Sequence, residues 1–190
     1  SVTLYYRYSG DNSSWGGWVS FGTDSASPWS WNFTFSNGTG YYEFYSIATD
    51  NAGNTESAPG SADDDCGYDY TAPTVTISVP TNGGYYNSLT NITGAASDAT
   101  SGVASVTITI YNASDGKYWN GSAWVASAVQ LSVTGTTSWY RNSGLPTWVD
   151  TKQYMVNATA TDNAGNTGTD SNSFTYDTTC LLYTSPSPRD

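Results

Sequence analysis

One eight-residue segment occurs twice in this chain, and it constrains the fold more than any other feature. The octapeptide ATDNAGNT stands at residues 48–55 and again at residues 160–167. An identity of this length does not arise by chance at any appreciable rate, so we interpret the chain as internally repeated. The separation of the two copies is the length of a small domain, which indicates tandem domains of one type.

The residues that precede each octapeptide alternate in the manner of a β-strand. Every second residue of a strand points to the same face, and in both copies these positions carry mostly apolar or small side chains. The matched sets are Tyr42, Phe44, Ser46 and Ala48 in the first copy and Tyr154, Val156, Ala158 and Ala160 in the second. The chain is rich in tyrosine and tryptophan (16 and 8) and only 11% charged, which suits strands better than helices. The sequence therefore predicts an all-β protein.

Residues 71–179 have the length and rhythm of one complete domain. Val75, Ile77 and Val79 alternate as a first strand that ends at Pro80. Further strands are expected at residues 89–96, 103–111, 119–125, 128–133, 138–141, 154–160 and 174–176. Short strands at this spacing are typical of an immunoglobulin-like β-sandwich.

The two copies also match at the beginning of another strand. The segment SVTL at residues 1–4 matches SVTI at residues 105–108, and a segment with two tryptophans follows in each copy. The second copy has residues 71–104 ahead of this match, whereas the first copy has nothing there. We therefore expect tandem immunoglobulin-like β-sandwiches, with residues 1–70 an N-terminally truncated repeat plus linker and residues 71–179 a complete repeat.

Tyr154 opens the penultimate strand of the complete repeat, at the place where such sandwiches have a tyrosine corner. In that motif the ring packs in the core and the hydroxyl bonds to the backbone of the preceding turn. Tyr42 has the same place in the first copy. The alternative is that each is an ordinary inward-facing aromatic residue.

Composition argues against several classes of function. The net charge is −11 with five basic residues, whereas nucleic acids and anionic membrane surfaces are bound through clustered Lys and Arg. The chain has no histidine, the commonest general base and transition-metal ligand, and no run of 18 apolar residues that would span a bilayer. We therefore expect no enzyme, no catalytic or cofactor-binding residues, no nucleic-acid partner and no membrane insertion in this segment.

The acidic run Asp63–Asp65 falls in the connection between the repeats, directly before Cys66. A carboxylate run can bind a hard cation, but we expect a solvated loop of mutually repelling charges. Cys66 has no histidine or basic neighbour that would lower its pKa, so we expect no reactive thiol there.

Two further features bear on surface function. Tyr118, Trp119 and Trp124, beside Asn120, form either an aromatic platform for sugar rings or part of a sandwich core. Asn112, in a predicted turn, is the better exposed candidate for glycosylation among seven Asn-x-Ser/Thr sequons. These sequons begin at Asn12, Asn32, Asn37, Asn91, Asn112, Asn120 and Asn157.

Three aspartates are expected to meet where one repeat meets the next. In an immunoglobulin-type sandwich the second-to-third and sixth-to-seventh strand loops lie at the end that the incoming chain reaches, and here these places carry Asp98, Asp162 and the linker residue Asp69. Three carboxylates repel one another unless a cation joins them, and calcium prefers six to eight oxygen ligands. The prediction is a calcium site. The alternative is that Asp162 belongs to a tight turn and Asp98 caps its own loop.

The motifs TAPTVTISVPTNGGYYNS, YWNGSAW and YMVNATATDNAGN resemble the immunoglobulin-like repeats of large bacterial and archaeal cell-surface and secreted proteins. The resemblance covers residues 71–179 fully and residues 1–70 in part. It implies a non-catalytic structural or adhesive module of an extracellular microbial protein, with neighbouring repeats and cell-surface glycans as partners. The alternative is a carbohydrate-binding accessory module of a secreted hydrolase.

The last residues do not continue the repeat. After residue 179 the first copy predicts Ala-Pro and a new strand, but the chain reads CLLYTSPSPRD. This segment resembles a translated sequencing adapter of the kind found at contig ends in metagenomic assemblies. We therefore expect residues 180–190 to be a non-native tail, which leaves Cys66 without a cysteine partner here.

Overall fold

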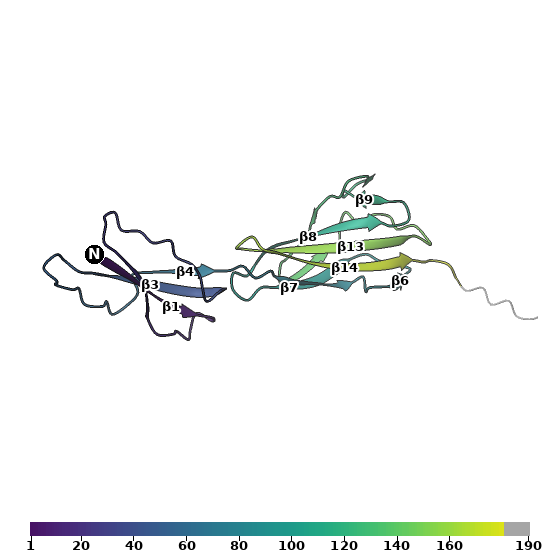
Figure 1. Ribbon diagram of the computed structural model, residues 1–190. Coiled ribbons are helices and arrows are strands. Elements are labelled where there is room, and N and C mark those ends of the chain that lie inside the picture. The colour runs from purple at the N-terminus through teal and green to yellow at the C-terminus, as the bar shows by residue number, and fades with distance from the viewer. Residues whose placement is uncertain (181–190) are drawn as a thin grey trace, which may run out of the picture. The chain divides into compact units, whose positions relative to one another are not determined.

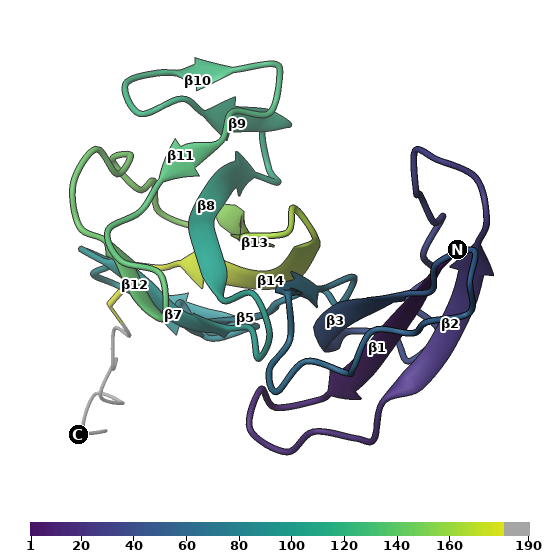
Figure 2. The same ribbon diagram turned by 90° about the vertical axis from the view of Figure 1, so that its left-hand side faces the viewer.

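The computed structural model describes residues 1–180, which form β-strands joined by turns and loops (Figure 1, Figure 2). Its contacts divide the chain into two compact units. The first comprises Ser1–Ala72 with the short segments Asp98–Gly102 and Asn163–Asn166. The second comprises Pro73–Ser97, Val103–Asp162 and the described residues from Thr167 to Cys180.

The second unit is a sandwich of two β-sheets. Antiparallel strands β8 (Val103–Asn112), β13 (Gln153–Asp162) and β14 (Thr167–Tyr176) form the centre of the larger sheet. Its shorter strands are β9 (Lys117–Trp119), β10 (Trp124–Val125), β11 (Leu131–Ser132) and β6 (Gly84–Tyr86). The smaller sheet has the order β12 (Ser138–Arg141), β7 (Ile92–Ser97) and β5 (Thr74–Val79). The two sheets confirm the predicted immunoglobulin-like β-sandwich.

The core of this sandwich lies between the sheets and follows the predicted alternation. Ile108 and Ile110 of β8 are fully buried, as is Ile92 of β7. Trp139 of β12 is only 1% exposed and is the largest of the buried side chains. Burial of each such side chain contributes about 1.5–3 kcal/mol to folding. The same cluster includes Val75, Ile77, Leu89, Ala96, Val106, Trp119, Leu131, Tyr154, Val156, Ala158, Ala160 and Phe174.

Some elements differ from the sequence expectation. Strand β7 begins at Ile92 and not at residue 89, although Leu89 is still buried. Strand β14 begins at Thr167 and not at residue 174, because its first half is polar and gains its strand conformation from pairing with β13. Strand β6, three residues long, was not predicted.

One edge of the smaller sheet is closed by side chains of β14. The carboxylate of Asp170 accepts a hydrogen bond from the backbone N–H of Ile77 at 2.7 Å. The buried amide of Asn172 donates to the carbonyls of Ile77 and Pro80, at 3.0 and 2.9 Å. Because these groups replace a neighbouring strand, the outer edge of β5 is not left as a free template for pairing.

The first unit contains one sheet in the part of the chain that the structure describes. Its order is β2 (Val19–Asp24), β1 (Val2–Ser9), β3 (Gly40–Ala48) and β4 (Asp64–Tyr68), and all pairs are antiparallel. The run Asp63–Asp65 was expected in a loop, but the structure places Asp64 and Asp65 in β4. Charged residues on such an edge strand oppose pairing with another chain.

The central pairing register of the first unit coincides with that of the second. The pairs between β1 and β3 are the same as those between β8 and β13 once the two copies are aligned. Val2↔Ala48 corresponds to Val106↔Ala160, and Tyr8↔Tyr42 corresponds to Asn112↔Tyr154. The five pairs between these ends also correspond, so the sequence match extends to the strand pairing.

Aromatic rings from residues 29–35 lie against one face of this sheet. Phe33 contacts Tyr6 and Phe44, with ring centroids 5.0 and 4.9 Å apart. Phe35 contacts Tyr42 at 5.0 Å and stacks on Tyr68 at 4.1 Å. These rings cover part of a face that has no second sheet over it among the described residues.

The predicted limits 1–70 and 71–179 stay predictions. The expected non-native tail, residues 180–190, lies outside the described residues except for Cys180, which is exposed.

Candidate cation site and polar networks

Asp98 caps its own loop. One of its carboxylate oxygens accepts hydrogen bonds from the backbone N–H groups of Thr100, Ser101 and Gly102, at 3.1, 2.9 and 2.9 Å. Asp and Asn side chains commonly close turns in this way. This geometry agrees with the alternative to calcium binding, in which Asp98 caps its own loop. The three hydrogen bonds hold the carboxylate in a fixed position.

Asp69 is held by residues of the same unit. One carboxylate oxygen accepts from the hydroxyl and the N–H of Ser101 at 2.6 and 3.2 Å, and the other from the N–H of Thr71 at 2.9 Å. Burial acts to raise the pKa of Asp69, but hydrogen bonds from Ser101, Thr71 and Thr39 together hold the pKa below its usual value. The sequence prediction did not include Ser101, whose spacing three residues after Asp98 is the only signal for it.

The structure places two of the three aspartates that the sequence singled out beside one another. Asp69 and Asp98 belong to the first unit, and both accept a hydrogen bond from the N–H of Ser101. Asp162, the last residue of β13, belongs to the second unit and is 2% exposed. Calcium binding by the three carboxylates stays a prediction.

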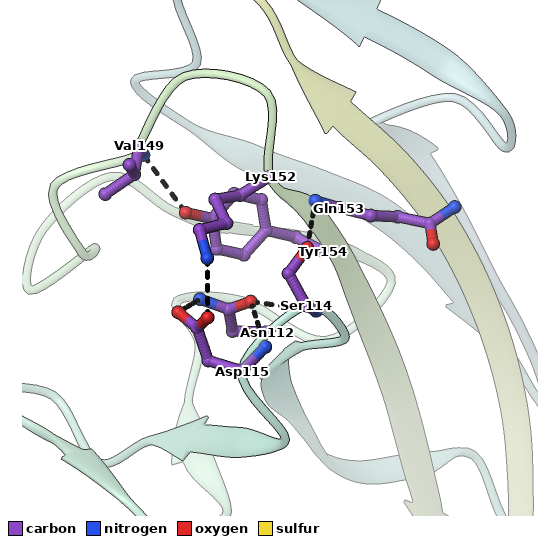
Figure 3. A network of polar contacts seen from close by, with 7 residues as sticks. All are labelled: Asn112, Ser114, Asp115, Val149, Lys152, Gln153 and Tyr154. Atoms are coloured by element: carbon purple, nitrogen blue, oxygen red, sulfur yellow. Dashed lines mark hydrogen bonds and ion pairs between the residues drawn. The ribbon is translucent and has the colours of Figure 1, made fainter.

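Both tyrosines predicted to form corners do so. The hydroxyl of Tyr154 accepts a hydrogen bond from the backbone N–H of Val149 at 3.0 Å, and the ring is fully buried (Figure 3). The hydroxyl of Tyr42 donates to the carbonyl of Gly38 at 2.8 Å. Burial raises the pKa of both phenols. The partner groups lie four and five residues upstream, as the motif requires.

A polar network joins the turn after β8 to the beginning of β13 (Figure 3). The amide oxygen of Asn112 accepts from the N–H groups of Ser114 and Asp115, and its amide nitrogen donates to the Asp115 carboxylate at 2.9 Å. Lys152 pairs with that carboxylate at 2.6 Å. The hydrogen bond from Lys152 is the main reason that the pKa of Asp115 lies below its usual value. Because every partner is a side chain or backbone group of this region, the network fixes the turn.

The structure favours the core alternative for Trp119 and contradicts the expected exposure of Asn112. Trp119 is 9% exposed and its indole N–H donates to the carbonyl of Gly144 at 2.7 Å, so the ring belongs to the core and not to a sugar platform. Trp124 packs between Trp119 and Tyr154. Asn112 is 3% exposed, so it is not the exposed candidate for glycosylation that the sequence predicted.

Cys66 lies in β4 and pairs with the corner residue Tyr42. In the second unit Phe174 pairs with the corner residue Tyr154, so Cys66 corresponds to Phe174. Burial, followed by the charges of Asp64 and Asp65, raises the pKa of its thiol. Such a thiol is a poor nucleophile at neutral pH, in agreement with the sequence expectation.

Comparison with known proteins identifies a family. No curated protein matches the chain. One similar solved structure is CopC from Methylosinus trichosporium OB3b, 17% identical, covering 58% of this chain and 100% of that chain with a TM-score of 0.41. Another is that of the fibronectin(III)-like modules of Clostridium thermocellum CbhA, 15% identical, covering 95% and 83%, with a TM-score of 0.37.

The described residues include no helix long and apolar enough to cross a membrane. The family model described as bacterial Ig-like domain matches residues 58–178, which is more than half of the chain. The sandwich of two sheets with its tyrosine corner is the architecture that such a domain requires. The chain therefore belongs to the bacterial Ig-like domain family.

Proposed function

We propose that this chain is a non-catalytic structural and adhesive module of an extracellular microbial protein, in which sandwiches joined in series hold other domains at a distance. The observation that carries the proposal is the bacterial Ig-like domain match over residues 58–178. A buried core closed by a tyrosine corner and by Asp170 and Asn172 at the edge of β5 supports a load-bearing role, because each fixes a segment that would otherwise fray.

The partners proposed with this role are neighbouring Ig-like repeats of the same protein and cell-surface glycans. A surface poor in Lys and Arg, with a net charge of −11, supports neutral partners over nucleic acid or an anionic membrane.

Single-molecule pulling tests the mechanical role. The chain is tethered at its ends between marker domains of known unfolding force and stretched. We expect a separate unfolding peak for the second unit. The gain in contour length at this peak should match the number of residues that the second unit contains. Unfolding without a measurable force would contradict a load-bearing role.

The alternative proposal is a carbohydrate-binding accessory module, and a glycan array tests it. Trp119, one of the three rings on which it was based, is 9% exposed, which weighs against this alternative. Saturable binding to one glycan class by this chain would favour the alternative. Binding to none would leave the structural role as the function.

A further inference from the structure

One face of the first unit's sheet is only partly covered. Leu4, Tyr6 and Phe44 share this face by register with Tyr42, and these three side chains are half-buried. Their counterparts in the second unit, Ile108, Ile110 and Val156, are fully buried by the sheet of β5, β7 and β12. The opposite face of the first sheet is covered differently, by Arg7 stacked on Trp15 and Trp18.

Residues 29–35 lie over this face with the sequence pattern of a strand but without a strand partner. Aromatic side chains alternate at Trp29, Trp31, Phe33 and Phe35, and Phe33 and Phe35 contact the sheet. Within residues 1–180, no hydrogen bond from outside residues 29–38 reaches the backbone of residues 31–35. A backbone edge of this kind is a template for pairing with another strand.

A hollow of about 350 Å³ lies beside this segment. Leu4, Trp31, Phe44 and Asp64 are among the residues that line it. The indole N–H of Trp31 is buried and has no acceptor among the described residues, which is costly unless an acceptor is supplied.

The second unit shows what covers the corresponding face. There β12, with Trp139 inward, pairs with β7, and β7 pairs with β5. Asn172 then bonds to the backbone of β5. Asn172 occupies the register position of Asp64, because Asn172 pairs with Val156 and Asp64 with Phe44. In the first unit the residue at this position lines the hollow.

We propose that this face of the first unit is a docking site for an antiparallel strand pair with the chemistry of β5 and β7. One strand of the pair bonds to the backbone of residues 31–35, and its small or β-branched side chains fill the hollow. In the second unit, β5, β7 and β12 cover the corresponding face, and this interface is the basis for the proposed occupant. That template, Thr74–Ser97, has no charged residue, which matches the apolar face. The inference goes beyond the proposed structural role, since it assigns a binding surface.

A graft onto the full chain tests the proposal. A second copy of residues 73–104 is joined ahead of Ser1. This junction is chosen because Ser1 aligns with Ser105, the residue that follows residue 104 in the second unit. We expect amide exchange at residues 31–35 to slow by about tenfold or more, and the emission of the tryptophans to shift to the blue. The control is the same graft with Ile77→Asp and Ile92→Asp in the added copy, where we expect neither change. Equal exchange in graft and control would overturn the proposal.

A second arm does not depend on the graft folding. A synthetic peptide of residues 73–104 is added to the unmodified chain, and the same amides are followed. Saturable protection supports the proposal, and no protection at about 1 mM peptide overturns it. Sedimentation of the unmodified chain is the third measurement. A dimer with residues 31–35 protected would assign the face to a second copy and contradict the proposal.

Discussion

Tyr42 and Tyr154 each form a tyrosine corner in their own unit. The hydroxyl of one donates a hydrogen bond, whereas the hydroxyl of the other accepts one. Tyr154 accepts from the N–H of Val149, whereas Tyr42 donates to the carbonyl of Gly38. A phenol can do either, so the turn before the strand can change while the corner is kept. The residue that matters is therefore the tyrosine, and the sequence of the turn is free to vary.

Replacing Tyr154 by phenylalanine tests the corner. Tyr154→Phe keeps the ring in the core but leaves the N–H of Val149 without its acceptor. We expect the free energy of unfolding in urea to fall by about 1–3 kcal/mol. Tyr140→Phe is the control, since the ring of Tyr140 is 42% exposed, and we expect almost no change. A loss equal to that of the control would show that Tyr154 is only a core ring.

Lys152 is expected to control the acid behaviour of Asp115. The hydrogen bond and charge of Lys152 lower the pKa of Asp115, so Lys152→Met should raise that pKa toward its ordinary value, as read from the carboxyl carbon shift in an NMR titration. A folded-state pKa below the unfolded one stabilises the protein above the unfolded pKa, and this stability is lost as pH falls through the folded pKa. The native chain should therefore lose more stability than the variant below about pH 4. An unchanged titration midpoint of Asp115 would contradict the assignment.

At the scale of the element, strand β14 contributes to both sheets of the sandwich. It pairs with β13 along its length, and its polar side chains reach the edge of β5 in the other sheet. The polar side chains of β14 therefore stabilise the sandwich. Asp170 and Asn172 form hydrogen bonds with backbone groups of β5 that would otherwise lie at an open edge.

Asn172→Ala tests this closure. The change leaves the carbonyls of Ile77 and Pro80 without their donor in a buried place. We expect a loss of about 1–3 kcal/mol in unfolding free energy and faster amide exchange in β5. Ser171→Ala, at an exposed position of the same strand, should change neither. If both variants behave alike, the edge of β5 does not depend on Asn172.

Elements with a local pattern were predictable and elements made by long-range pairing were not. The alternation before each octapeptide predicted β3 and β13, and the corner tyrosines followed from their place in the strand. The polar half of β14 carries no hydrophobic pattern, and its structure comes from β13. Asn112 reads as a turn residue in the sequence, but its burial depends on Asp115 and on packing that the sequence does not display.

At the scale of the whole molecule, the two units differ in how completely they bury their cores. Among residues 1–180, the second unit has two sheets around its core, whereas the first has one sheet with an aromatic segment over it. We expect residues 71–179 to fold alone and residues 1–70 not to, because a lone sheet leaves apolar surface in water. Amide spectra of the two separate pieces check this, and a cooperative thermal transition of residues 1–70 would contradict it.

Calcium binding is the prediction that involves the most distant parts of the chain. Asp69, Asp98 and Asp162 are far apart in the sequence, and the sequence predicts that their carboxylates share one cation. In the first unit, Asp69 and Asp98 both accept a hydrogen bond from the N–H of Ser101. A cation that binds only the folded chain stabilises it, by about 2.7 kcal/mol at 100 times its dissociation constant. We therefore expect heat on calcium titration and a higher melting temperature in calcium than in chelator.

Variants separate cation binding from a general effect of removing acid groups. Asp98→Asn also weakens the cap of its own loop, so the quantity to compare is the calcium-dependent part of the melting shift, which should fall in this variant. Asp115→Asn, whose carboxylate pairs with Lys152, should keep the full calcium-dependent shift. Calcium should also exceed magnesium in effect, because magnesium demands a stricter octahedral shell and gives up its water reluctantly. No heat at millimolar calcium together with an unchanged melting temperature would show that Asp98 is a loop cap and Asp162 a turn residue.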